Sequence, residues 1–85
     1  MQLSVNNGPT STLDLLREGQ EAVLERLDVP ADTARRLMEL GFVPGHTVSA
    51  ARSAPGGDPR VFRVDGSEVA LRLETARHLQ VRLTE

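Results

Sequence analysis

The sequence contains no cysteine, no tryptophan and no tyrosine, and it has only two phenylalanines. Without cysteine the chain can hold no disulfide, no thiolate zinc site, no iron–sulfur cluster and no cysteine nucleophile. With so few aromatic side chains, the core must be built from leucine, valine and alanine. Stacking of nucleic-acid bases on aromatic rings also has little support.

An excess of basic residues is missing as well. Ten basic residues face twelve acidic ones, which gives a formal net charge of −2. Nucleic-acid-binding proteins usually carry excess positive charge, because neutralising phosphates supplies much of their affinity. The charge balance therefore argues against a nucleic-acid partner.

Long apolar segments are absent too. No run approaches the roughly 18–20 apolar residues that cross a bilayer, and the first seven residues do not resemble a signal peptide. We therefore expect a cytoplasmic protein without membrane insertion. The 85 residues suit one domain, and a domain of this size has little room for a deep catalytic cleft beside its core.

The clearest element is a helix predicted from about Pro30 to Leu40. Pro30 suits the first turn of a helix. Gly41 suits the left-handed residue that ends one, and Phe42 is expected to fold back on the last turn. Pro44 prevents the helix from resuming. The apolar face predicted for this helix consists of Ala34, Leu37 and Met38, with Leu40 near its edge.

Alternating apolar residues predict short strands separated by turn residues. The predicted strands span residues 21–28, 47–53, 60–65, 68–73 and 79–83, and short helical turns are predicted at residues 12–16 and 74–78. Leu27 breaks the alternation, which indicates a bulge. Asp65-Gly66 is typical of a tight hairpin turn.

This order of elements predicts a mainly β domain with one α-helix. Because the connections between strands are too short for parallel crossovers, we expect an antiparallel arrangement. We predict a small closed β-barrel of about five strands with a helical insertion, since closure removes exposed edges. Residues 1–11 are predicted to form a flexible N-terminal tail, and residues 12–85 the barrel domain.

Three segments resemble the FeoA family in order and spacing. Leu37–Gly45 resembles the family signature, in which a helix ends in Leu-Gly and is followed by an apolar residue and Pro-Gly. Residues 52–59 resemble the family's Arg, Ala-Pro, Gly-Asp-Pro loop, and Val69–Arg72 with residues 76–81 resemble its third landmark. The likeness runs from about Thr12 to Leu83 and implies an SH3-like barrel.

The resemblance also implies a function. It places the chain beside FeoB, a membrane ferrous-iron transporter with a cytoplasmic GTPase domain, as a non-enzymatic accessory that binds or regulates it. No resident cofactor is implied. The same barrel is similar to the C-terminal domain of iron-dependent repressors, but no helix-turn-helix precedes it here. Arg60 departs from the family pattern, which often has an apolar residue there.

The loop at residues 54–59 is longer than a hairpin needs, and binding often resides in such loops. Asp58 is expected to accept backbone N–H groups or to pair with Arg52 or Arg60. Long cationic side chains are expected to keep their heads in water, where they could dock on an acidic partner surface. The predicted partner-binding residues are Arg52, Pro55, Asp58, Arg60, Val61 and Arg72. The predicted structural residues are Leu40, Gly41, Pro44, Gly45, Gly57 and Pro59.

His46 and His78 are the only histidines and the only weak candidates for metal ligands. Ferrous iron accepts histidine and carboxylate ligands, but neither residue belongs to a ligand-spacing motif. No motif places a nucleophile beside a base, and the glycine-rich loop lacks the P-loop lysine. Two alternatives stay open: a metal-responsive sensor or carrier that binds Fe(II) transiently, and a generic SH3-like protein-interaction module.

Overall fold

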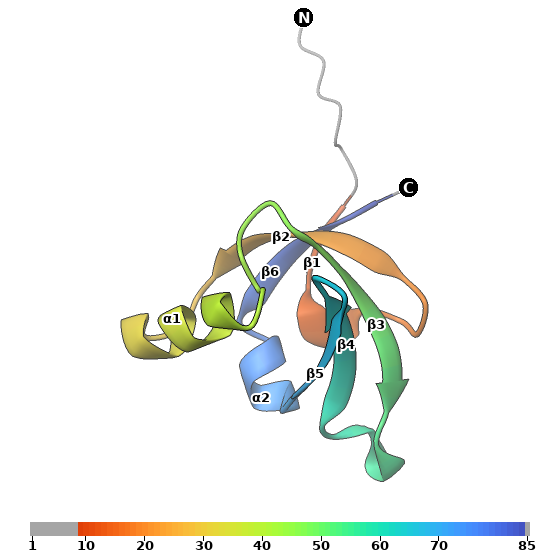
Figure 1. Ribbon diagram of the computed structural model, residues 1–85. Helices are drawn as coiled ribbons and strands as arrows, with labels where there is room; N and C mark the ends of the chain where they lie inside the picture. Colours follow the sequence, from red (N-terminus) through yellow and green to blue (C-terminus); the bar gives the residue numbers. More distant parts are fainter. Residues whose placement is uncertain (1–8, 85) are drawn as a thin grey trace, which may run out of the picture.

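The computed structural model describes residues 9–84 and has the form of one curved sheet with helices at one end (Figure 1). The strands are β1 (Thr10–Thr12), β2 (Glu21–Leu27), β3 (Thr47–Ser53), β4 (Arg60–Val64), β5 (Ser67–Leu71) and β6 (Leu79–Leu83). The helices are α1 (Ala31–Glu39) and α2 (Leu73–Ala76), and two 3-10 turns are η1 (Leu13–Leu15) and η2 (Pro55–Gly57). The mainly β prediction with one substantial helix is confirmed.

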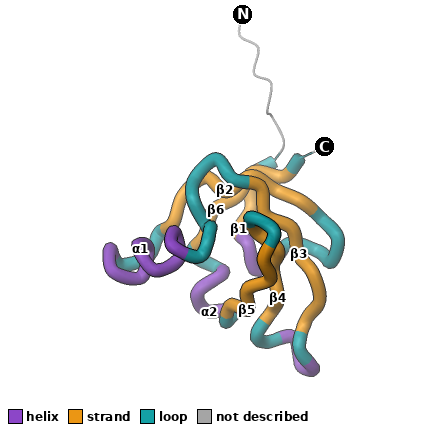
Figure 2. Tube along the Cα trace, viewed as in Figure 1, coloured by secondary structure: helices purple, strands orange, loops and turns teal. Residues whose placement is uncertain are grey.

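The sheet is antiparallel, with strand order β1-β6-β2-β3-β4-β5. It curls without closing, because β1 and β5 are edges and no hydrogen-bonded ladder joins them within residues 9–84 (Figure 2). The predicted closed barrel is therefore wrong in this respect. Strand β1 uses its three residues to pair with β6, and the chain then turns into η1 without reaching β5.

Strand β1 also changes the predicted N-terminal boundary. Thr10 and Ser11, which we assigned to the tail, pair with Arg82 and Val81 of β6. Of the rest of the predicted tail, Pro9 precedes β1 and residues 1–8 lie outside the described residues.

The predicted alternation places one face of each strand in a single core. Phe42 and Phe62 are fully buried at its centre, and a register shift lies between Leu24 and Arg26, just before the predicted bulge at Leu27. The buried apolar residues are Leu13, Leu16, Ala22, Leu24, Leu37, Phe42, Val48, Ala50, Phe62, Val64, Leu71, Ala76, Leu79 and Val81. The inward faces predicted for the strands are confirmed.

Helix α1 ends at a glycine, as predicted. Gly41 has a φ of +112°, its N–H donates to the carbonyl of Met38, and the N–H of Phe42 donates to the carbonyl of Leu37. This pair of bonds is the Schellman motif. A side chain at position 41 would meet the β4–β5 hairpin, because its Cβ would lie 3.1 Å from Oδ2 of Asp65.

The apolar face predicted for α1 is only partly buried. Leu37 lies in the core, but Met38 and Leu40 are 40% and 48% exposed. Their assignment to the core-facing side is therefore wrong. The helix lies to one side of the sheet and projects away from it (Figure 1), so one row of side chains reaches the core.

A side chain of β4 reaches across to the segment that follows β1. Arg60 begins β4, in register with Leu71 of the edge strand β5. Its Nη1 donates to the carbonyl of Asp14 at 3.1 Å and to the carbonyl of Leu16, both in the segment that follows β1. The guanidinium carbon also lies 5.5 Å from the centre of the Phe62 ring, within cation–π range. Arg60 thus links the two ends of the sheet.

We expect Arg60→Ala to lower the free energy of unfolding by about 2–3 kcal/mol, because the charged hydrogen bonds to two carbonyls and the contact with the Phe62 ring are lost together. Urea denaturation followed by circular dichroism measures this change. The matched control is Arg77→Ala, which removes an exposed arginine of the same charge and should change stability by less than about 0.5 kcal/mol. Equal effects of the two substitutions would contradict the link.

Gly41→Ala should destabilise the protein by more than Gly19→Ala. Both glycines have positive φ angles, but an added Cβ meets Asp65 at position 41 and nothing within 4 Å at position 19. We expect about 1 kcal/mol of backbone strain at each position, with the steric contact adding to it only at position 41. Thermal unfolding of both variants measures the difference in stability. Equal losses of stability would show that the β4–β5 hairpin moves aside at no energetic cost.

Candidate functional site

The segment after α1 forms a turn that is bonded to the middle of β2. The N–H of Gly45 donates to the carbonyl of Leu24 at 2.8 Å, and the N–H of Leu24 donates to the carbonyl of His46 at 2.9 Å. Gly45 has a φ of +97°, which favours glycine. Pro44 stands on the surface of this turn. The family-like segment therefore fixes the end of α1 against the sheet.

Two large apolar side chains are exposed at the end of α1. Met38 and Leu40 are two residues apart and leave the end of the helix on different sides, and we use the name α1 patch for this exposed end of α1. A third large apolar side chain, Leu15, is 66% exposed and lies on η1, a different element. The α1 patch could not be predicted, because helical spacing alone cannot tell which apolar residues a projecting helix leaves uncovered.

An open groove of about 440 Å³ lies between β2, β6 and the turn after α1. It is lined by Val23, Leu24, Glu25, Arg26, Pro44, Gly45 and Gln80. Sequence reasoning did not find this groove, since its walls come from three segments that only the fold brings together.

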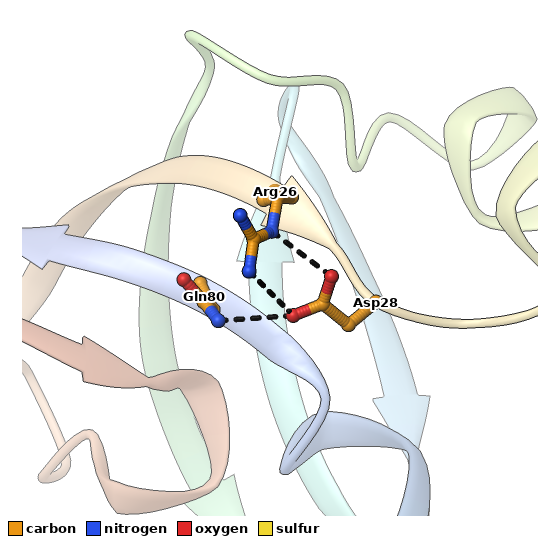
Figure 3. A network of polar contacts seen from close by, with 3 residues as sticks. All are labelled: Arg26, Asp28 and Gln80. Carbon is orange, nitrogen blue, oxygen red and sulfur yellow. Dashed lines mark hydrogen bonds and ion pairs between the residues drawn. The ribbon is translucent and has the colours of Figure 1, made fainter.

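A polar network joins the strands at this groove (Figure 3). Arg26 donates from Nε to Oδ1 of Asp28 at 2.9 Å and from Nη2 to Oδ2 at 3.1 Å, and Gln80 Nε2 donates to the same Oδ2 at 2.9 Å. The hydrogen bond and the charge of Asp28 raise the pKa of Arg26. Because Asp28 neutralises Arg26, the groove is not a dedicated anion site.

The outer face of β3, β4 and β5 carries an arginine–glutamate network. Glu68 accepts from Arg63 at 2.7 Å and from Arg52 at 3.2 Å. The hydrogen bond from Arg63 and then that from Arg52 lower the pKa of the Glu68 carboxyl. Val61, which lies on β4, is half-buried. The predicted docking residue Arg52 is therefore exposed but already paired.

Asp58 ties the β3–β4 loop to the start of α2. Its Oδ1 accepts the N–H of Leu73 at 3.0 Å and lies 3.6 Å from Nε of Arg72. Asp58 thus accepts a backbone N–H as expected, but the arginine beside it is Arg72 rather than Arg52 or Arg60. The same loop contains Pro55 and Gly57 in η2. The peptide bond between Asp58 and Pro59 is cis.

Arg60 differs most from its predicted role. We expected its head to lie in water on a docking surface, but its Nη1 is bound to two backbone carbonyls and its Nε is a buried atom. Because this side chain holds the fold, its replacement cannot report on docking alone.

The two histidines lie in different settings. Nδ1 of His46 is 3.4 Å from Oδ1 of Asp65, an ion pair only when the imidazole is protonated. His78 is exposed after α2, and its carbonyl accepts the N–H of Asp28. Within residues 9–84, neither histidine belongs to a group of three histidine, aspartate or glutamate side chains able to hold a metal ion. The helices of this part of the chain are all too short or too polar to cross a bilayer.

Comparison with known proteins identifies the family to which this fold belongs. The FeoA domain family matches residues 11–83. A curated relative from Porphyromonas gingivalis, an Fe(2+) transport protein A/Fe(2+) transporter FeoB fusion protein, is 35% identical over 71 residues. The match covers 84% of this chain but only 8% of the fusion protein.

Solved structures agree with this assignment. FeoA from Chlorobium tepidum has a TM-score of 0.80 at 30% identity, over 85% of this chain and 69% of that one. FeoA from Stenotrophomonas maltophilia, solved with zinc and described as an SH3 domain protein, has a TM-score of 0.72 at 39% identity, over 82% and 87% of the two chains.

A manganese-dependent transcriptional repressor shares the fold alone. Its TM-score is 0.77 at 18% identity, over 93% of this chain and 44% of that one. The SH3-like fold predicted from the resemblance is confirmed, with an open sheet in place of a closed barrel. The chain belongs to the FeoA family.

Proposed function

We propose that this chain is a non-catalytic accessory of ferrous-iron transport that binds the cytoplasmic part of a FeoB-type transporter and modulates iron uptake. The observation that carries the proposal is the P. gingivalis relative, in which a segment similar to this chain is joined to FeoB in one polypeptide. Covalent fusion holds two modules at high effective concentration. Separate chains need an interface to achieve the same proximity.

The mode of recognition differs from that of proline-rich ligands. Domains that bind such ligands present a groove lined by aromatic side chains. This chain has no Trp or Tyr, and Phe42 and Phe62 are fully buried. The SH3-like fold therefore lacks the surface that a proline-rich segment requires, and the transporter must be bound elsewhere.

The α1 patch is the surface we favour for docking. Met38 and Leu40 are large apolar side chains that remain in water in the free chain, and such residues supply binding energy when a partner covers them. The turn after α1 continues from Leu40 to Pro44, which lines the neighbouring groove. A partner on α1 could thus extend into the groove and bury both surfaces.

The outer face of β3–β5, which carries the predicted docking residues Arg52 and Val61, is the competing surface. Its cations Arg52 and Arg63 are both bound to Glu68, and exposed pairs of this kind contribute little to affinity. The charged groups of this face are therefore already paired, whereas the apolar side chains of the α1 patch are still uncovered.

We propose that iron is the transported cargo and not a resident ligand of this chain. His46 and Asp65 supply one imidazole and one carboxylate near each other, which is fewer protein ligands than the two histidines and one carboxylate of a typical ferrous site. Fe(II) binding by this chain is therefore proposed as weak and transient.

We expect this chain to be retained by full-length FeoB-type transporter in a pull-down, with and without Fe(II) and GTP. The double substitution Met38→Glu with Leu40→Glu should weaken retention at least ten-fold, because it places charges where apolar contact is needed. Binding is measured by biolayer interferometry on the detergent-solubilised transporter.

Two matched variants locate the interface. Leu15→Glu makes the same change at an exposed leucine of another element and should leave binding unchanged. Val61→Glu tests the outer face of β3–β5. Loss of binding with Val61→Glu alone would move the interface to that face, and no retention of the unaltered chain under any condition would refute the proposed function.

A further inference from the structure

The outer edge of β5 is free. Strand β5 pairs with β4 on one side, and no strand within residues 9–84 pairs with its other side. A free edge presents backbone donors and acceptors that can pair with another chain. Of the side chains on β5, Ser67, Glu68 and Ala70 are exposed, so this edge is open to solvent.

The hairpin turn determines which backbone groups face outward. Asp65 and Gly66 have φ angles of +51° and +78°, which makes a two-residue type I′ turn. The flanking pair Val64 and Ser67 is then hydrogen-bonded, and pairs alternate from there. The N–H and C=O groups of Glu68 and Ala70 therefore point away from β4. The N–H of Arg72, which is still extended, does the same.

These outward groups are self-complementary. If two copies of β5 run antiparallel about a two-fold axis at Ala70, each Glu68 faces Arg72 of the second copy. Each Val69 then faces Leu71 of the second copy on the core side. Opposite charges and apolar pairs directly across a sheet are favourable. We propose that this chain forms a homodimer by antiparallel pairing of β5 in this register, so that two sheets become one.

The hydrogen bonds of this pairing can be counted. Ala70 exchanges two bonds with Ala70 of the second copy, and each Arg72 N–H donates to the carbonyl of the opposite Glu68. The carbonyl of Arg72 already accepts the N–H groups of Thr75 and Ala76 in α2. The ladder therefore ends at Arg72, where the chain turns into α2.

Charge complementarity favours a second copy and this register over the alternatives. A two-fold axis at Glu68 would set two carboxylates against each other, and an axis at Val69 would set Leu71 against Ser67. Arg72 lies 3.6 Å from Asp58 and is 69% exposed, so its guanidinium keeps free donors. Each oxygen of Glu68 accepts one arginine hydrogen bond and retains a second lone pair.

The dimer should be weak, because a five-residue strand pair buries less than the roughly 1,200 Å² of a standard interface. We expect sedimentation velocity to show monomer at about 10 µM and an increasing dimer fraction above about 100 µM. The experiment needs no transporter, so its outcome is independent of the proposed function. A single monomeric species up to 1 mM, on the order of 100-fold above the lowest concentration, would overturn the proposal.

Substitutions on the edge test the register. Ala70→Pro removes an outward N–H, which an edge strand tolerates, and should abolish dimerisation while circular dichroism stays unchanged. Arg72→Glu should weaken dimerisation about ten-fold through like-charge contact with Glu68 of the second copy. Arg77→Glu is the control of equal charge change on α2 and should have no effect.

The charge variants keep the proposal testable if Ala70→Pro does not fold. A dimer that is unaffected by Arg72→Glu, or one that Arg77→Glu weakens equally, would place the interface elsewhere and refute pairing through β5.

Discussion

The fold depends on how an open sheet is held in a curled shape. A closed barrel would join its first and last strands by a hydrogen-bonded ladder, but within residues 9–84 β1 pairs with β6 alone and β5 with β4 alone. Arg60 supplies the connection, since its guanidinium reaches from β4 to the carbonyls of Asp14 and Leu16 and lies against the Phe62 ring. Arginine suits this position because its planar fork can donate to several acceptors and stack on an aromatic ring at once. The open seam also leaves β5 with a free edge.

The segments that resemble the FeoA family each connect parts of the chain that are distant in sequence. Gly41 lets the end of α1 approach the hairpin at Asp65, Gly45 bonds to Leu24, and Asp58 caps the backbone at Leu73. The same segments carry the exposed features, since Met38 and Leu40 lie within Leu37–Gly45 and most of β5 lies within Val69–Arg72. The α1 patch and the β5 edge lie on different elements, so one copy of the chain can in principle use the two surfaces independently.

Local patterns predicted the elements well, because each is encoded by neighbouring residues. Alternation located the inward-facing Val48 and Phe62, and a glycine marked the end of α1. Properties that depend on distant contacts were not accessible in the same way. Nothing local to Arg60 shows that carbonyls from η1 will surround its head group, and nothing local to Met38 shows that the core ends before reaching it. The groove beside β2 likewise exists only after β6 and the α1–β3 turn have come together.

The most direct test of the central claim is an NMR measurement of the seam. The account predicts slowly exchanging guanidinium protons on Arg60, with nuclear Overhauser contacts from its side chain to the Phe62 ring and to Leu16. It also predicts no cross-strand contacts between β1 and β5. A rapidly exchanging Arg60 head group together with Hα–Hα contacts that join β1 to β5 would show a closed barrel and contradict the account.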